Sequence, residues 1–286
     1  MPVNPAFDAS SDNQFTSAKL ARMGMGQGDV MLAPDRSEPH IIRKLFVEFL
    51  GDTIFVFIGS LSALSAKESG VAAPAFAHGL TIAVLIMCFG HISGGHFNPC
   101  VTLGIALTGN IRPLTAVLYA GVQLLGGCFG ALLVRAVLSY DAYSTAAKGG
   151  ETLLPHLFSD YNDVAGTEWW QGIMCEMILT FILVNSVLMT AVDTDSNVLA
   201  PLAIGLSLTL DIFGAGHVSG ASMNPARSFG PAIMASIFAD HDTGVLPLSQ
   251  IWAYHYVYWI GPALGASLAA VTYKALLAKD EKRWLL

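Results

Sequence analysis

Hydrophobic residues in this chain gather into long stretches that are separated by polar segments. Charged residues are scarce in six such stretches, which cover residues 45–64, 75–90, 115–134, 169–192, 198–216 and 251–277. A transmembrane helix needs about 20 apolar residues to cross ~30 Å of hydrocarbon. Most of the stretches reach this length, and the shorter ones alternate with polar segments in the same regular way. The pattern therefore predicts an all-α membrane protein with six transmembrane helices.

The overall composition is that of a membrane protein. Hydrophobic residues make up 53% of the 286 residues and charged residues only 12%, whereas a soluble domain has about 25% charged residues. Residues 1–43 are polar and lack an apolar run, so we expect a disordered N-terminal tail and no cleaved signal. Residues 44–277 are then the membrane domain, with a loop at 139–168 between its halves and a C-terminal tail at 278–286.

Basic residues flank the first and the last of these stretches. Arg43 and Lys44 lie at the start of the first, and Lys279, Lys282 and Arg283 follow the last. Because basic flanks stay on the cytoplasmic side, and because an even number of spans returns the chain to the side it left, we expect both termini to be cytoplasmic. No basic stripe indicates a nucleic-acid partner.

One segment of the chain occurs twice. Gly-His-Ile-Ser-Gly-Gly-His-Phe-Asn-Pro-Cys at 90–100 matches Gly-His-Val-Ser-Gly-Ala-Ser-Met-Asn-Pro-Ala at 216–226. Glu48 and Glu176 lie at matching places in the apolar stretch that begins each copy. The chain therefore holds two repeats of three spans, at about 44–138 and about 169–277. An odd number of spans makes the second repeat enter from the opposite face, which gives an inverted 3+3 repeat.

Each repeat also contains an apolar run that is too short to span the membrane. Asn98-Pro99 and Asn224-Pro225 each join a stretch rich in Gly and Ser to such a run. Asn is a strong N-cap and Pro is favoured at the first helical position, so a helix should start at each pair. Irregular backbone at membrane depth is tolerated where it is buried in protein or lines a wet cavity. We therefore expect two re-entrant half-helices whose N-termini meet at a pore.

These features resemble the aquaporin, or major intrinsic protein, family over residues 43–277. The resemblance rests on the repeated Glu, on Ala-Arg-Ser-Phe-Gly-Pro at 226–231 and on two Asn-Pro boxes, Asn98-Pro99-Cys100 and Asn224-Pro225-Ala226. It implies a passive channel in the lipid bilayer that conducts water and small neutral solutes and excludes protons and ions. It also implies a homotetramer with one pore per subunit, no cofactor and no enzymatic activity.

The resemblance assigns four residues to the narrowest part of the pore. Counted from the two Asn residues, they are His78, Ile212, Ala221 and Arg227. This set is similar to that of the aquaporin-eight-like subgroup and of plant tonoplast channels, and it implies ammonia and hydrogen peroxide as solutes beside water. Glycerol channels of the family carry Asp after the Arg, where this chain has Ser228. The plasma membrane is the default location, and an intracellular or mitochondrial membrane is the alternative.

Glu48, Glu176 and His96 are expected to support the pore loops. A carboxylate within the membrane is costly without partners, and backbone N–H groups of the loops can provide them. The loop histidines lack a carboxylate or thiolate in recognisable ligand spacing, so no metal site is predicted. The sequence gives no explanation for Asp52, one turn after Glu48, or for Cys100 in place of the usual Ala.

Two other classes of function fit part of the pattern. Inverted repeats and broken helices also occur in secondary transporters, which work by alternating access. Transporters usually carry paired acids or cation-coordinating groups at the substrate site. An intramembrane enzyme needs a nucleophile with its base or a metal motif, and the spans contain neither pattern. Flux that is linear and does not saturate distinguishes a channel from a transporter.

Overall fold

The computed structural model describes residues 40–146, 152, 166–194, 197–238 and 248–284. The predicted tail up to residue 39 and most of the predicted loop at 139–168 lie outside these ranges. Within them, the helical segments long and apolar enough to cross a membrane number six, namely Ile41–Ser65, Ala72–Ser93, Pro113–Val137, Trp169–Val192, Ala200–Ser219 and Leu248–Leu277. The described residues contain no strand. The prediction of an all-α fold with six spans is confirmed.

Each repeat contributes three long helices and one half-helix. The first repeat consists of α2 (Ile41–Ser62), α4 (Ala72–Ser93), the half-helix α5 (Pro99–Leu107) and α6 (Pro113–Val137). The second consists of α7 (Trp169–Val187), α8 (Ala200–Ser219), the half-helix α9 (Pro225–Phe238) and α11 (Val257–Thr272). Shorter segments are α3 (Ala66–Ser69), α10 (Leu248–Ala253), 3₁₀ turns at Ala63–Ser65 and Asp280–Lys282, and π-helical turns at Ala142–Ala146, Leu188–Val192 and Tyr273–Leu277.

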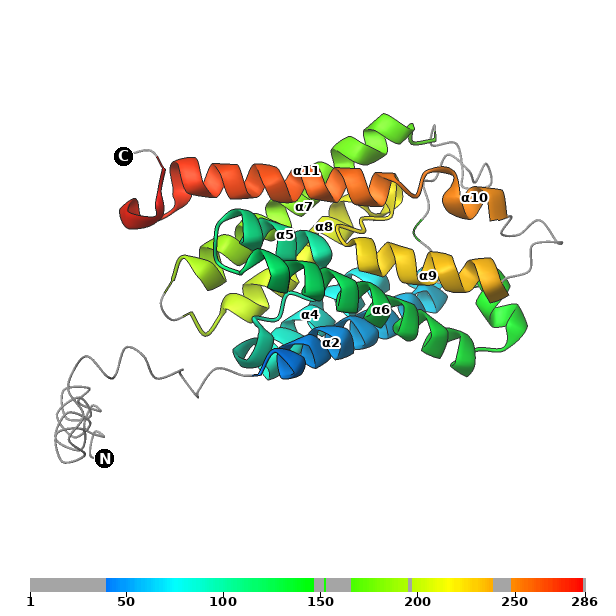
Figure 1. Cartoon of the computed structure of the whole chain (residues 1–286). Helices are drawn as coiled ribbons and strands as arrows, with labels where there is room; N and C mark the ends of the chain where they lie inside the picture. Colours follow the sequence, from blue (N-terminus) through cyan, green and yellow to red (C-terminus); the bar gives the residue numbers. More distant parts are fainter. Residues whose placement is uncertain (1–39, 147–151, 153–165, 195–196, 239–247, 285–286) are drawn as a thin grey trace, which may run out of the picture. The chain divides into compact units, whose positions relative to one another are not determined.

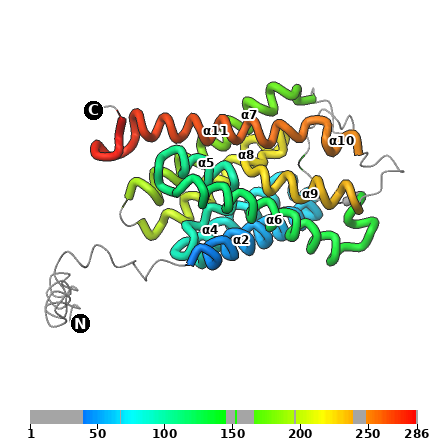
Figure 2. The backbone as a smooth tube through the Cα atoms, in the orientation of Figure 1, coloured from blue at the N-terminus to red at the C-terminus, as the bar shows by residue number. Residues whose placement is uncertain are grey.

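The helices pack in matching pairs. α2 lies along α6 in the first repeat as α7 lies along α11 in the second, and α4 lies against α8 between the repeats. Each half-helix packs on the last long helix of the other repeat, α9 on α6 and α5 on α11. α5 and α9 occupy opposite halves of the bundle's length (Figures 1 and 2). The two repeats are thus interleaved around their half-helices.

Glycines allow α4 and α8 to touch backbone to backbone. A Cβ added at Gly205 of α8 would lie 2.3 Å from Gly79 O and 2.7 Å from Ala83 Cβ on α4. A Cβ added at Gly79 would lie 2.4 Å from Gly205 O. Contacts under 3.0 Å are essentially never found for real Cβ atoms, so this crossing needs glycine on both helices. It fixes the separation of the helices that carry His78 and Ile212.

The residues after the sixth span fold back onto the end of the fourth. Asp193 is buried, and its Oδ1 accepts hydrogen bonds from Tyr273 Oη at 2.9 Å and from Lys279 N at 3.2 Å. Lys282 Nζ donates a hydrogen bond to Val192 O, the last backbone carbonyl of the fourth span, at 3.0 Å. The described part of the predicted C-terminal tail therefore contacts the membrane domain.

Candidate functional site

Each half-helix begins at an Asn whose side chain caps it. Asn98 Oδ1 accepts hydrogen bonds from Cys100 N at 2.7 Å and from Val101 N at 3.4 Å. Asn224 Oδ1 accepts hydrogen bonds from Ala226 N at 2.9 Å and from Arg227 N at 3.3 Å. These bonds satisfy helix N–H groups that have no intrahelical acceptor. The half-helices of the predicted fold therefore start where the Asn-Pro chemistry places them.

The remaining residues of the two boxes are structural parts of these helix starts. Pro99 and Pro225 are the first residues of α5 and α9. Cys100 is buried in the main hydrophobic core. Ala226 lies against α6, where a Cβ added at Gly127 would lie 2.4 Å from Ala226 O. Small residues at these two places thus fit the tight packing around the half-helices.

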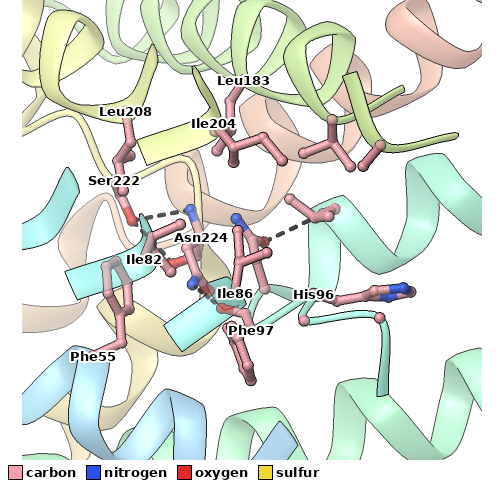
Figure 3. A pocket seen from close by; sticks show the side chains of 16 residues that line it. Phe55, Ile82, Ile86, His96, Phe97, Leu183, Ile204, Leu208, Ser222 and Asn224 are labelled. Carbon is pink, nitrogen blue, oxygen red and sulfur yellow. Dashed lines mark hydrogen bonds between the residues drawn. The ribbon is translucent and has the colours of Figure 1, made fainter. Parts of the chain in front are cut away.

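The N-termini of the two half-helices meet in the middle of the protein. Asn98 Nδ2 donates to Met223 O at 2.9 Å, and Asn224 Nδ2 donates to Phe97 O at 2.9 Å. The two Asn side chains are 4% and 2% exposed, and Asn224 lies beside Phe97 in Figure 3. Each helix N-terminus carries about half a positive charge, so two such charges face the same region.

The loops before the half-helices have the same backbone conformation in both repeats. Gly94 and Gly220 end α4 and α8 in the left-handed region, with φ of 98° and 85°. Phe97 and Met223 lie there too, with φ of 45° and 55°. Residues with a Cβ rarely adopt this region, so the conformation has to be held by contacts around the loops.

Glu48 supplies those contacts in the first repeat. It is fully buried. Its Oε1 accepts hydrogen bonds from Ser93 Oγ at 2.5 Å and His96 N at 3.1 Å, and its Oε2 accepts from Phe97 N at 2.7 Å and Gln123 Nε2 at 2.9 Å. Hydrogen bonds to an ionised carboxylate are short and strong. This side chain therefore holds two backbone N–H groups of the loop that leads into α5.

Glu176 makes the equivalent contacts in the second repeat. Its Oε1 accepts hydrogen bonds from Ser219 Oγ at 2.7 Å and Ser222 N at 2.9 Å, and its Oε2 accepts from Met223 N at 2.7 Å. The buried face of α11 carries Pro262 instead of a residue like Gln123. A proline side chain has no hydrogen-bond donor, so Glu176 has no counterpart of the Gln123 bond. The loop that leads into α9 is thus held in the same way, with one donor fewer.

Sequence reasoning missed other side chains that hold the loops. Tyr119 Oη donates to Ser93 O at 2.8 Å, and Tyr258 Oη donates to Ser219 O at 2.7 Å. Both tyrosines are buried on the last long helix of their repeat. Extending the comparison of the repeats to these helices would have identified them.

His96 links its loop to the half-helix α5 and to α6. Its Nδ1 lies 3.1 Å from Thr102 Oγ1, and its ring contacts the ring of Tyr119 edge to face at 5.3 Å. His96 also lines a cavity (Figure 3). Among the residues that the structure describes, no group of three or more His, Cys, Asp or Glu side chains could hold a metal ion.

An inner cavity of about 40 Å³ runs past the two Asn residues, which is room for a few water molecules at ~10–15 Å³ each. Residues of the two half-helix loops form one wall, and apolar side chains form the rest (Figure 3). The apolar residues include Phe55, Ile82, Ile86, Leu183, Ile204 and Leu208. A narrow polar strip therefore faces an apolar wall.

A wider vestibule of about 370 Å³ contains three of the four predicted filter residues. His78, Ile212 and Arg227 line it. Ala221 is 1% exposed and adjoins the lining residue Gly220. The structure thus brings together residues from α4, α8 and the start of α9.

Arg227 is held by a residue that the sequence did not indicate. Its Nη1 donates a hydrogen bond to Thr152 Oγ1, and Ser228 Oγ donates to the same oxygen at 3.1 Å. Thr152 is buried although it belongs to the segment between the repeats. A single Thr in the segment between the repeats has no pattern that would identify it.

Asp52 lies fully buried one turn after Glu48. Among the described residues its carboxyl oxygens make no hydrogen bond of good geometry, although the Asn224 side chain lies near it.

Six spans around two half-helices that meet beside a narrow cavity define a membrane channel. The family model for the major intrinsic proteins matches residues 35–273. The chain is 34% identical to aquaporin-8 of Mus musculus over 247 residues, which is 86% of each chain. It is 37% identical to aquaporin TIP1-2 of Musa acuminata over 251 residues, 84% of this chain and 88% of that one.

The chain belongs to the major intrinsic protein, or aquaporin, family. It is an integral membrane channel for water or other small solutes, and not an enzyme. Its fold matches the aquaglyceroporin from Plasmodium falciparum with a TM-score of 0.69 over 83% of this chain and 97% of that chain. At 20% identity, this likeness shows the shared fold alone and does not bear on the solute.

Proposed function

We propose that this chain is a passive channel for water that also conducts ammonia and hydrogen peroxide and excludes protons and ions. The observation that carries the proposal is the reciprocal bonding of Asn98 and Asn224 at the wall of the inner cavity. An amide nitrogen has two hydrogens. Each Asn donates one to the opposite loop. The other hydrogen of Asn98 can be donated to the oxygen of a passing molecule, whereas Asp52 lies near the side chain of Asn224.

The electrostatics of the two half-helices support the exclusion of protons. Together their N-termini carry about one positive charge. At ~4 Å and an effective dielectric constant of about 20, these two N-termini by themselves repel an excess proton by about 4 kcal/mol. The carboxylates of Glu48 and Glu176, which hold the loops from outside the cavity, offset part of this repulsion. A neutral molecule meets no such net charge. The two amide donors also interrupt the chain of donors along which a proton would hop.

The vestibule supports the choice of solutes. We propose His78, Ile212, Ala221 and Arg227 as the selectivity filter. The guanidinium of Arg227 is always charged and presents several donors, so it repels cations and orients polar solutes. The aliphatic Ile212 makes the filter less polar and the small Ala221 leaves space in it. Solutes that form weaker hydrogen bonds than water can then pass. Ser228 after the Arg is the reason that we do not propose glycerol.

The setting of the channel is part of the proposal. We propose a homotetramer with a pore in each subunit, both termini in the cytoplasm, and the plasma membrane as its location, with an intracellular or mitochondrial membrane as the alternative. Basic residues at both ends of residues 44–277 support this orientation. Many apolar side chains are exposed along the spans, as lipid and subunit contacts require.

Uptake by proteoliposomes tests the filter assignment. Water, methylammonium and hydrogen peroxide are compared for the parent, Arg227→Ala and His78→Phe. The larger Phe ring narrows the vestibule, so we expect His78→Phe to lower methylammonium uptake more than water uptake. Loss of the guanidinium charge should raise methylammonium uptake relative to water. Equal changes for all solutes would count against the assignment.

A secondary transporter is the alternative function. None of the described residues that line the two cavities is acidic, which favours the channel because coupled transporters usually hold their ion with such groups. Flux that saturates with solute concentration, or that depends on an ion gradient, would favour the transporter.

A further inference from the structure

Gly59 of α2 lies directly behind the ring of His78. A Cβ added at Gly59 would lie 2.3 Å from His78 Nε2, 2.7 Å from Cδ2 and 2.8 Å from Cε1. The three nearest atoms all belong to this ring. Glycine is disfavoured within a helix, so the place of Gly59 in α2 calls for a contact that excludes a side chain. The His78 ring is that contact.

The ring is enclosed on its other protein sides. Its Nδ1 donates to Pro74 O at 2.8 Å, one turn earlier on α4. Phe55 of α2 packs against it edge to face at 5.3 Å and 80°, and the side chain as a whole is 2% exposed. The remaining side faces the vestibule that Arg227 also lines. A displacement of the ring away from Gly59 and Phe55 therefore moves it toward this vestibule.

We propose that Gly59 is a positioning residue that sets the width of the filter by letting His78 lie back against α2. This inference rests on the proposed function, because it takes His78 as a filter residue. Ordinary van der Waals contact begins at 3.4 Å, so a methyl group at position 59 pushes the ring by about 1 Å toward the vestibule. Because the proposed filter is the narrowest part of the route, such a shift narrows the route at the filter.

The test is solute flux through the full chain in proteoliposomes. We expect Gly59→Ala to lower both water and methylammonium permeability by about tenfold or more, because both must pass the displaced ring. The matched control is Gly121→Ala in α6, where an added Cβ meets nothing within 4 Å. This control should stay within about twofold of the parent. Circular dichroism and size-exclusion chromatography record whether each variant is folded.

Removal of the ring separates positioning from folding. We expect Gly59→Ala combined with His78→Ala to regain the permeability of His78→Ala alone, since the added methyl group then has nothing to push. Permeability of Gly59→Ala within about twofold of the parent would overturn the inference. A loss that His78→Ala does not restore would overturn it too, because Gly59 would then act on the fold.

The same set of variants distinguishes this inference from the proposed function. If His78→Ala alone leaves the ratio of methylammonium to water permeability unchanged, the filter assignment itself fails. If His78→Ala changes that ratio but Gly59→Ala has no effect, the filter assignment stands and only the role of Gly59 is wrong.

Discussion

Glu48 and Glu176 show how single side chains hold irregular backbone inside a membrane. Each carboxylate accepts backbone N–H groups from the loop that precedes a half-helix. The N–H groups would otherwise lie buried without acceptors, which is costly where no water is present. The loops keep their unusual φ values because these bonds are made.

Replacing Glu176 by Gln tests this role. The amide provides one acceptor oxygen where the carboxylate provided two, so a backbone N–H of Ser222 or Met223 loses its partner. We expect the free energy of unfolding to fall by about 1–3 kcal/mol and water flux to fall with it. The measurements are thermal unfolding in detergent and stopped-flow shrinkage. The exposed Glu68 provides the control, and a Glu176→Gln variant as stable as Glu68→Gln would contradict the role.

Thr152 is predicted to limit the freedom of Arg227. In Thr152→Val the shape is kept but the hydroxyl oxygen that accepts from Arg227 and Ser228 is lost. A bond to a charged group contributes about 1.5–3 kcal/mol, so we expect the guanidinium to be held by one contact fewer and methylammonium permeability to rise several-fold relative to water. Thr167→Val, in the same inter-repeat segment, is the control. An unchanged ratio in Thr152→Val would show that Arg227 is held by other contacts.

At the scale of helices, the crossing of α4 and α8 sets the spacing of the vestibule walls. Gly205→Ala places a methyl group against Gly79 O, and overpacking of this kind costs about 1–3 kcal/mol. We expect a lower melting temperature and altered solute selectivity. Gly214→Ala on the same helix meets nothing within 4 Å and should be neutral or slightly stabilising. Equal melting temperatures for the two variants would argue against a tight crossing.

The sequence predicted those elements that depend on local chemistry. The six spans follow from the length of apolar runs, and the half-helices follow from Asn and Pro at a helix start. Thr152, Gln123 and Gly59 could not be predicted in this way. Each acts through a contact with a residue distant in sequence, and neither a Thr between the repeats nor a Gly in an apolar helix indicates its partner.

At the scale of the whole molecule, the inverted repeat makes one pore from two equal halves. Each repeat provides a half-helix, a capping Asn and a glutamate that holds the loop before it. The two halves meet through reciprocal amide bonds, so neither repeat forms the passage alone. The two repeats also differ, because Gln123 holds Glu48 in the first repeat alone and Arg227 lies at the start of the half-helix in the second repeat alone.

The central claim is that two opposed half-helices form a passage open to water and closed to protons. It is tested most directly by measuring water and proton flux on the same proteoliposomes under an osmotic gradient and then a pH gradient. We predict water flux well above that of protein-free vesicles, linear in the gradient and without saturation, and a proton flux equal to that of protein-free vesicles. Saturable water flux, or proton entry that rises with the amount of protein, would contradict the claim.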